Sequence, residues 1–204
     1  MKCHFLMTGG LLAGLIGSTL PAQLSPAHFA DLARIRGADR ARVWLVIVGD
    51  FASDGSRSFQ RDAWPVIDSL YVRPGKVRVA WINLPNPASK SSQIAAEVAA
   101  CAGSGSKFWP VHDAILLEQP RWIGLADPTR FLVELADLHG GNSEIISECL
   151  QKHELKAFLQ SDIARAQRAG IHTAPGYLVD NRVVAGGQTL LMLRQAIGQA
   201  LARH

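Results

Sequence analysis

The sequence predicts an α/β domain in which a strand–helix–strand unit and a later strand–strand–helix unit are separated by a long helical segment. Two strongly apolar runs, residues 41–51 and 75–85, flank a stretch with helical spacing. Two short apolar runs and a final amphipathic segment follow residue 175. The stretch between the two units shows only helical patterns. This order of signals predicts one α/β domain with a helical insertion.

The first unit has the strongest pattern. Residues 41–51 (ARVWLVIVGDF) are rich in β-branched and aromatic side chains, which is typical of a strand buried on both faces. Residues 56–71 place apolar side chains at helical spacing, and Pro65 is expected to kink this helix because it removes a backbone donor. Residues 75–85 alternate in polarity and predict the next strand, with Gly75 at the turn. We therefore expect a βαβ unit with a right-handed crossover.

The helical insert is expected over about residues 91–170. Its helical patterns fall into four segments, residues 92–103, 108–118, 128–140 and 143–170. The last of these is long enough for two helices in series. After the insert, residues 176–187 predict two short strands joined by a tight turn at 180–182. Residues 189–202 predict a last amphipathic helix.

The first 22 residues have the pattern of an export signal. Lys2 gives a short positive region, residues 5–20 carry no charge, and Pro21-Ala22 suits cleavage before Gln23. The uncharged run is shorter than the roughly 20 residues that span a bilayer. We therefore expect cleavage, export to the periplasm or the medium, and no membrane span in the mature protein.

The mature chain would keep 182 of the 204 residues, enough for one domain with its own core. Its 20 basic and 17 acidic residues are scattered, so the charge pattern does not predict nucleic-acid binding. Two cysteines remain, Cys101 and Cys149, and an even count in an oxidising compartment suggests a disulfide. Their spacing of 48 residues fits no zinc pattern and the seven histidines are dispersed, so we expect neither a metal nor a cofactor.

The element order is that of a thioredoxin fold with an inserted helical subdomain. Over residues 41–202 the chain resembles the DsbA-like branch of thioredoxin-fold proteins, which are exported thiol-disulfide oxidoreductases. Two of the segments that carry the resemblance contain specific motifs: residues 95–116 contain a Phe-Trp…His-Asp stretch, and residues 170–197 contain a Thr-x-Pro stretch. The other matching positions are Asp50-Phe51, Phe59 and INLPNP at 82–87. The resemblance implies that residues 23–204 form one DsbA-like domain.

In that family the loop after the Asp-Phe pair, here residues 50–51, carries a Cys-x-x-Cys pair at the start of the first helix. The helix N-terminus lowers the pKa of the first thiol and so favours the reactive thiolate. Alignment on the Asp-Phe pair places Ser53 and Ser56 in the two cysteine positions, with Asp54 and Gly55 between them. A serine hydroxyl forms no disulfide, so dithiol exchange at this loop is excluded. We expect Ser53 or Asp54 to cap the helix instead.

Thr173-Ala174-Pro175 matches the family loop whose proline is cis and faces the active-site helix. In the family, the backbone before this proline pairs with an extended peptide by strand addition. By resemblance, Ala174 and Pro175 are candidate peptide-binding residues, and the expected partner is an extended peptide, an unfolded protein or a partner protein. The alternative is that Pro175 only shapes its loop.

These features lead us to expect a non-catalytic binding module rather than an enzyme. One alternative is residual thiol chemistry through Cys101 and Cys149, which we expect instead to form a structural disulfide. Ser53 also fits the position of the serine in glutathione transferases that share this scaffold. A third alternative is a Ser–His hydrolase, with His172 as base to Ser53 or Ser56 and Asp50 or Asp54 orienting it; the sequence lacks the Gly-x-Ser-x-Gly elbow.

Overall fold

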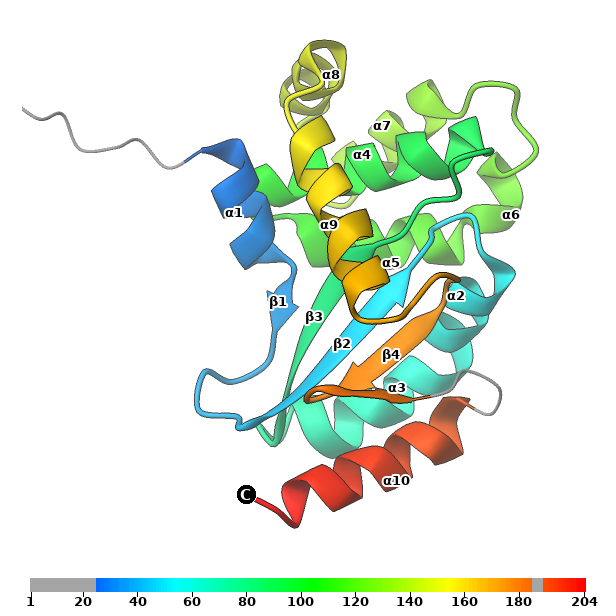
Figure 1. Cartoon of the computed structure of the whole chain (residues 1–204). Coiled ribbons are helices and arrows are strands. Elements are labelled where there is room, and N and C mark those ends of the chain that lie inside the picture. Colours follow the sequence, from blue (N-terminus) through cyan, green and yellow to red (C-terminus); the bar gives the residue numbers. More distant parts are fainter. Residues whose placement is uncertain (1–24, 185–188) are drawn as a thin grey trace, which may run out of the picture.

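A computed structural model describes residues 25–184 and 189–204 (Figure 1). The expected export signal at residues 1–22, and the end of the predicted strand pair at 185–187, lie outside the described residues. The described chain forms a five-stranded mixed sheet in the order β1-β3-β2-β4-β5. Strands β2 and β3 are parallel and the other neighbours are antiparallel; the strands are β1 (Ile35–Arg36), β2 (Val43–Gly49), β3 (Val77–Asn83), β4 (Gly176–Val179) and β5 (Arg182–Val184).

Helices cover both faces of this sheet. The segment 54–72 and helix α10 (Thr189–Leu201) pack on one face, against alternate side chains of β2 and β3 such as Leu45 and Val79. Helix α9 (Lys156–Arg168) crosses the opposite face, where Ala166 packs against Val48 (Figure 1). The expected two-sided burial of β2 holds at its carboxyl end, whereas Trp44 and Val46 are only partly covered. The sheet therefore separates a large core from a smaller one.

The helix expected over residues 56–71 is present, but it is not a regular α-helix. Two α-helical pieces, α2 (Asp54–Ser58) and α3 (Trp64–Ile67), alternate with two π-helical turns, Phe59–Ala63 and Asp68–Val72. The first π turn lies directly before Pro65, which lacks the N–H of a regular α-helical bond. The proline thus changes the winding of the helix without ending it.

The insert predicted over residues 91–170 consists of six helices that extend over residues 90–168. They are α4 (Lys90–Ser104), α5 (Phe108–Leu117), α6 (Gln119–Trp122), α7 (Thr129–Leu138), α8 (Ser143–Lys152) and α9. The last predicted segment is indeed two helices in series, α8 and α9. The short α6 was not expected, because four residues are too few to show a helical period.

The described residues begin with two elements that the sequence pattern did not predict. Helix α1 (Pro26–Ala33) starts at Ser25, whose Oγ accepts a hydrogen bond from His28 N at 3.3 Å. Serine followed by proline is a start signal that was available in the sequence. Strand β1 extends the sheet beside β3. The buried Arg34 next to it forms an ion pair with Asp162 of α9, in which Nη1 of the arginine donates to both carboxylate oxygens at 2.6 Å. This pair fixes α1 and β1 to the insert.

Candidate peptide-binding site

Asp50 follows the carboxyl end of β2 and fixes the loop that carries the two serines. Its buried carboxylate accepts hydrogen bonds from Ala52 N at 2.9 Å, Ser92 Oγ at 2.6 Å and Asn86 N at 3.3 Å. These partners come from the loop itself, from the segment after β3 and from the first turn of α4. One carboxylate thus holds three segments together at the edge of the candidate site.

Ser53 lies at the N-terminus of α2, as the sequence predicts for the first cysteine position. Its Oγ accepts a hydrogen bond from Ser56 N at 3.3 Å and caps the helix. The same hydroxyl donates to the carbonyl oxygen of Ala174 at 3.2 Å. Ser56 is buried, and its hydroxyl accepts from Asp50 N at 3.3 Å. Both serine hydroxyls are therefore engaged in bonds that position the loop.

The Ala174–Pro175 peptide bond is cis, and this turn lies directly against the start of α2. A Cβ atom built on Gly55 would be 2.7 Å from Cδ of Pro175, closer than two carbon atoms can pack. Glycine at this position therefore allows the proline loop and the helix to meet. The structure brings together Ser53, Ser56, Ala174 and Pro175, all four of the expected loop residues.

A residue that the sequence analysis missed connects the helical insert to the same loop. Gln119, at the start of α6, is buried and its Nε2 donates to the carbonyl oxygens of Phe51 at 2.7 Å and Ser53 at 3.1 Å. A lone glutamine next to a proline gave no motif from which this role could be inferred. The insert therefore supports the backbone of the serine loop.

A groove of about 710 Å³ opens beside Ser53 and Ala174. One wall is the loop after β2, and the others are the segment at residues 84–87, which follows β3, and the residues before the cis proline. Ile163 and Gln167 of α9 line it as well. The groove thus passes Ala174, the residue directly before the cis proline.

His172 lies on this groove but does not form a catalytic pair with either serine. Its side chain is exposed and makes no hydrogen bond to Ser53 or Ser56, all of which belong to the described residues. Asp50 is bound to Ser92, and Asp54 is exposed in the first turn of α2. The arrangement lacks the contiguous nucleophile, base and orienting carboxylate that serine hydrolases use.

Cys101 and Cys149 form a disulfide, as the sequence predicts, and they join α4 to α8. Cys101 is 1% exposed and Cys149 3% exposed, among the apolar residues of the main core. Neither is hydrogen-bonded to the serine loop or lines its groove. The disulfide is thus a buried bridge within the helical insert.

A buried histidine lies behind the loop. His112 of α5 is 1% exposed and is surrounded by the rings of Phe51, Trp81 and Trp109 at centroid distances of 5.3, 4.3 and 5.0 Å. Burial lowers the pKa of His112, although its 2.8 Å contact with the Asp113 carboxylate opposes this change. His112 is therefore held in its neutral form at neutral pH.

Across residues 25–184 and 189–204, no three His, Cys, Asp or Glu side chains are grouped as metal ligands. None of the helices in these ranges is both long enough and apolar enough to span a bilayer.

A family model described as thioredoxin matches residues 31–199. The Na(+)/H(+) antiporter NhaA 1 of Salinispora arenicola is 26% identical over 204 residues, 95% of this chain and 28% of the antiporter. A putative protein-disulfide oxidoreductase of Rickettsia conorii is 24% identical over 146 residues, 70% of this chain and 51% of that protein. The chain thus spans about half the length of these curated relatives, or less.

Two solved structures have the same fold. BdbD from Bacillus subtilis, in its oxidised form, gives a TM-score of 0.76 at 22% identity and covers 83% of this chain and 92% of its own. Alpha-DsbA1 from Wolbachia pipientis gives a TM-score of 0.72 at 17% identity, with coverages of 83% and 91%. The chain therefore belongs to the thioredoxin family, and within it to the proteins of DsbA-like fold.

Proposed function

We propose that this protein is an exported, non-catalytic member of its family that binds extended polypeptide segments in the groove beside Ala174. The observation that carries the proposal is the position of Ser53. Its hydroxyl caps α2 and binds the carbonyl oxygen of Ala174, in the place where a redox-active relative has its reactive thiol. By the resemblance, Ser53 and Ser56 stand where the family has its two reactive cysteines, so this loop lacks the sulfur atoms that exchange requires.

The chemistry of serine supports the absence of redox activity at this loop. Thiol–disulfide exchange requires a thiolate that attacks a disulfide and a second sulfur that completes the new bond. A helix N-terminus stabilises a nearby negative charge by about 0.3–1 kcal/mol, which is far too little to ionise a hydroxyl near neutral pH. Ser53 and Ser56 therefore contribute polar contacts and no electron transfer.

The shape of the groove supports a polypeptide ligand. An extended peptide can add to a backbone edge through main-chain hydrogen bonds. Ala174 is half-buried and borders a groove of about 710 Å³, and its carbonyl oxygen also accepts a hydrogen bond from Ser53. Backbone pairing of this kind is largely independent of sequence, so the groove would accept many unfolded segments. Contacts with groove side chains would then supply preference among them.

Burial of the disulfide supports a structural role for Cys101 and Cys149. An incoming thiolate must reach a sulfur atom along the S–S axis, and both cysteines are enclosed in the core. The chain-entropy model gives about 4 kcal/mol of stabilisation for a closed loop of this length. The alternative is that Cys101 and Cys149 exchange their disulfide with a substrate. The insulin assay distinguishes this redox role from the structural one.

The test compares the native protein with the double variant Ser53→Cys/Ser56→Cys. Native protein is expected to bind fluorescein-labelled unstructured peptides in an anisotropy titration and to leave the rate at which dithiothreitol reduces insulin unchanged. The double variant is expected to catalyse insulin reduction, because the scaffold still presents the N-terminus of α2. The matched control is Ser58→Cys, an exposed position of the same helix without a capping bond.

Two results would count against the proposal. Faster insulin reduction with the native protein than with dithiothreitol alone would place redox chemistry at Cys101 and Cys149. Failure of the native protein to bind any peptide of the panel would remove the binding function. Export is tested separately, by the mass of the secreted protein, which is expected to begin at Gln23.

A further inference from the structure

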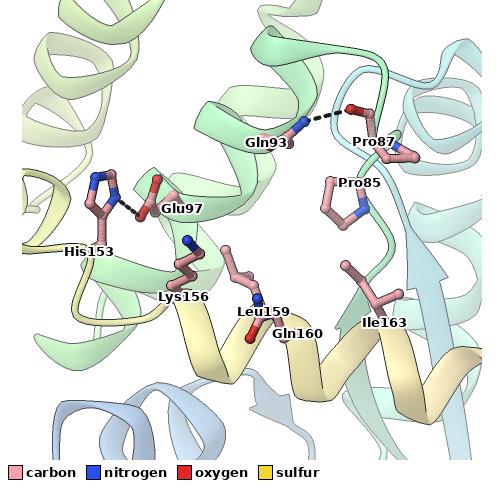
Figure 2. Close-up of a pocket in the computed structure, with 9 residues that line it drawn as sticks. All are labelled: Pro85, Pro87, Gln93, Glu97, His153, Lys156, Leu159, Gln160 and Ile163. Atoms are coloured by element: carbon pink, nitrogen blue, oxygen red, sulfur yellow. Dashed lines mark hydrogen bonds and ion pairs between the residues drawn. The ribbon is translucent and has the colours of Figure 1, made fainter.

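A second hollow of about 400 Å³ lies between α4 and α9 (Figure 2). It shares Pro85, Pro87 and Ile163 with the groove beside Ser53. Because the same three side chains line both, the two hollows adjoin each other along Pro85, Pro87 and Ile163. The second hollow thus lies next to the groove beside Ser53, on the side of the helical insert.

The inner part of this hollow is apolar. Leu159 and Ile163 extend from α9 toward α4, and Pro85 faces them from the segment after β3 (Figure 2). Gln93 of α4 donates its Nε2 to the carbonyl oxygen of Pro87 at 2.9 Å and so fixes the rim. A bulky aliphatic side chain fits such a surface, since its burial removes apolar area from water.

The far end of the hollow is charged. Glu97 of α4 is only 18% exposed at its side chain, and its carboxylate is contacted by Nδ1 of His153 at 3.2 Å. Lys156, the first residue of α9, is exposed and has no ion-pair partner among the described residues (Figure 2). The most exposed charge at this end is therefore the ammonium group of Lys156, while the Glu97 carboxylate is largely covered and contacted by His153.

We infer that this second hollow is a specificity subsite for the polypeptide that occupies the main groove. The subsite takes an aliphatic side chain against Pro85, Leu159 and Ile163, and an acidic side chain of the same segment pairs with Lys156. The inference rests on the proposed function, because only a peptide bound beside Ala174 would extend from the main groove into the second hollow. The subsite makes the protein prefer segments that carry an aliphatic side chain and an acidic side chain, whereas backbone pairing in the main groove is independent of sequence.

The test uses charge reversal. The peptides are unstructured, labelled with fluorescein and contain one leucine. They are made in pairs that differ only in having glutamate or lysine at one position, and this position moves along the peptide from pair to pair. Each peptide is titrated against native protein and Lys156→Glu. An acidic residue is tolerated at the start of a helix, so the variant is expected to fold. The matched control is Lys76→Glu, an exposed change of equal charge in the turn before β3.

Native protein and the Lys76→Glu control are expected to bind the best glutamate peptide about threefold more tightly than its lysine twin, as for a partly exposed ion pair. Lys156→Glu is expected to reverse this preference. If native protein binds peptides and Lys156→Glu leaves the preference unchanged, the subsite is wrong and the proposed function stands. If native protein binds no peptide, both fail. Light scattering that shows a dimer weakened by Lys156→Glu would instead assign the hollow to a second copy of this chain and overturn the inference.

Discussion

At the scale of single residues, Ser53 shows how one hydroxyl group can connect two distant segments of the chain. Its hydroxyl accepts from Ser56 N and donates to Ala174 O, so it connects the start of α2 to the cis-proline turn. A thiol at this position would be a reactive nucleophile, whereas the hydroxyl is a structural link. The residue is thus expected to matter for stability as well as for binding.

Ser53→Ala is expected to lower the free energy of unfolding by about 1 kcal/mol, the usual effect of removing a serine N-cap. Urea denaturation followed by circular dichroism measures the change. Ser58→Ala is the control, because Ser58 is exposed in the same helix and forms no capping bond. Equal stability of the two variants would show that the Ser53 bonds contribute nothing.

At the scale of elements, the insert and the sheet are held together by a few long-range connections. The disulfide joins α4 to α8, Arg34 ties the start of the chain to Asp162 of α9, and Gln119 of α6 supports the serine loop. Each connection joins residues that are distant in the sequence. Arg34 and Gln119 connect the helical insert to the rest of the domain, whereas the disulfide lies within the insert.

The double variant Cys101→Ala/Cys149→Ala is expected to lower the free energy of unfolding by about 2–5 kcal/mol, as for other native disulfides. The expected cause is the greater freedom of the unfolded chain together with two small cavities in the core. Chemical denaturation with and without reductant measures it. Peptide binding by the folded variant should stay unchanged, and a loss of binding without a loss of stability would contradict a structural role.

At the scale of the whole molecule, buried aromatic rings form a continuous core behind the site. His112 is enclosed by them and pairs through Nδ1 with Asp113, while Arg36 lies within 3.2 Å of the same carboxylate and over the ring of Trp109. A neutral imidazole is compatible with this apolar surrounding. A protonated one is not, so stability becomes dependent on pH.

Burial lowers the pKa of His112 below its ordinary value of 6.5. The unfolded chain therefore binds a proton that the folded chain does not, and stability is lost as pH falls below 6.5, by at most about 1.4 kcal/mol per unit. Urea denaturation at a series of pH values measures this slope. His112→Gln is expected to flatten it, and His139→Gln, at an exposed position, should not. A native slope that persists in His112→Gln would contradict the assignment.

The sequence by itself determined the order of the elements and the chemistry of the loop. Runs such as residues 41–51 and the helical periods of the insert are local patterns, and local patterns can be recognised without a structure. The two serines of the loop, Ser53 and Ser56, can also be read directly from the sequence, where the resemblance predicts that they stand in the two cysteine positions. From these observations followed the fold, the cap at Ser53 and the pairing of Cys101 with Cys149.

Only the tertiary structure decided how the site is assembled. Ser53 and Ala174 are 121 residues apart, and Gln119 reaches the serine loop from another element without any motif. The two-residue strand β1 has no period to detect, and it is formed by pairing with β3. The groove is likewise made of segments that share no local signal. Such features depend on contacts between distant parts of the chain, which leave no regular spacing in the sequence because they are created when the chain folds.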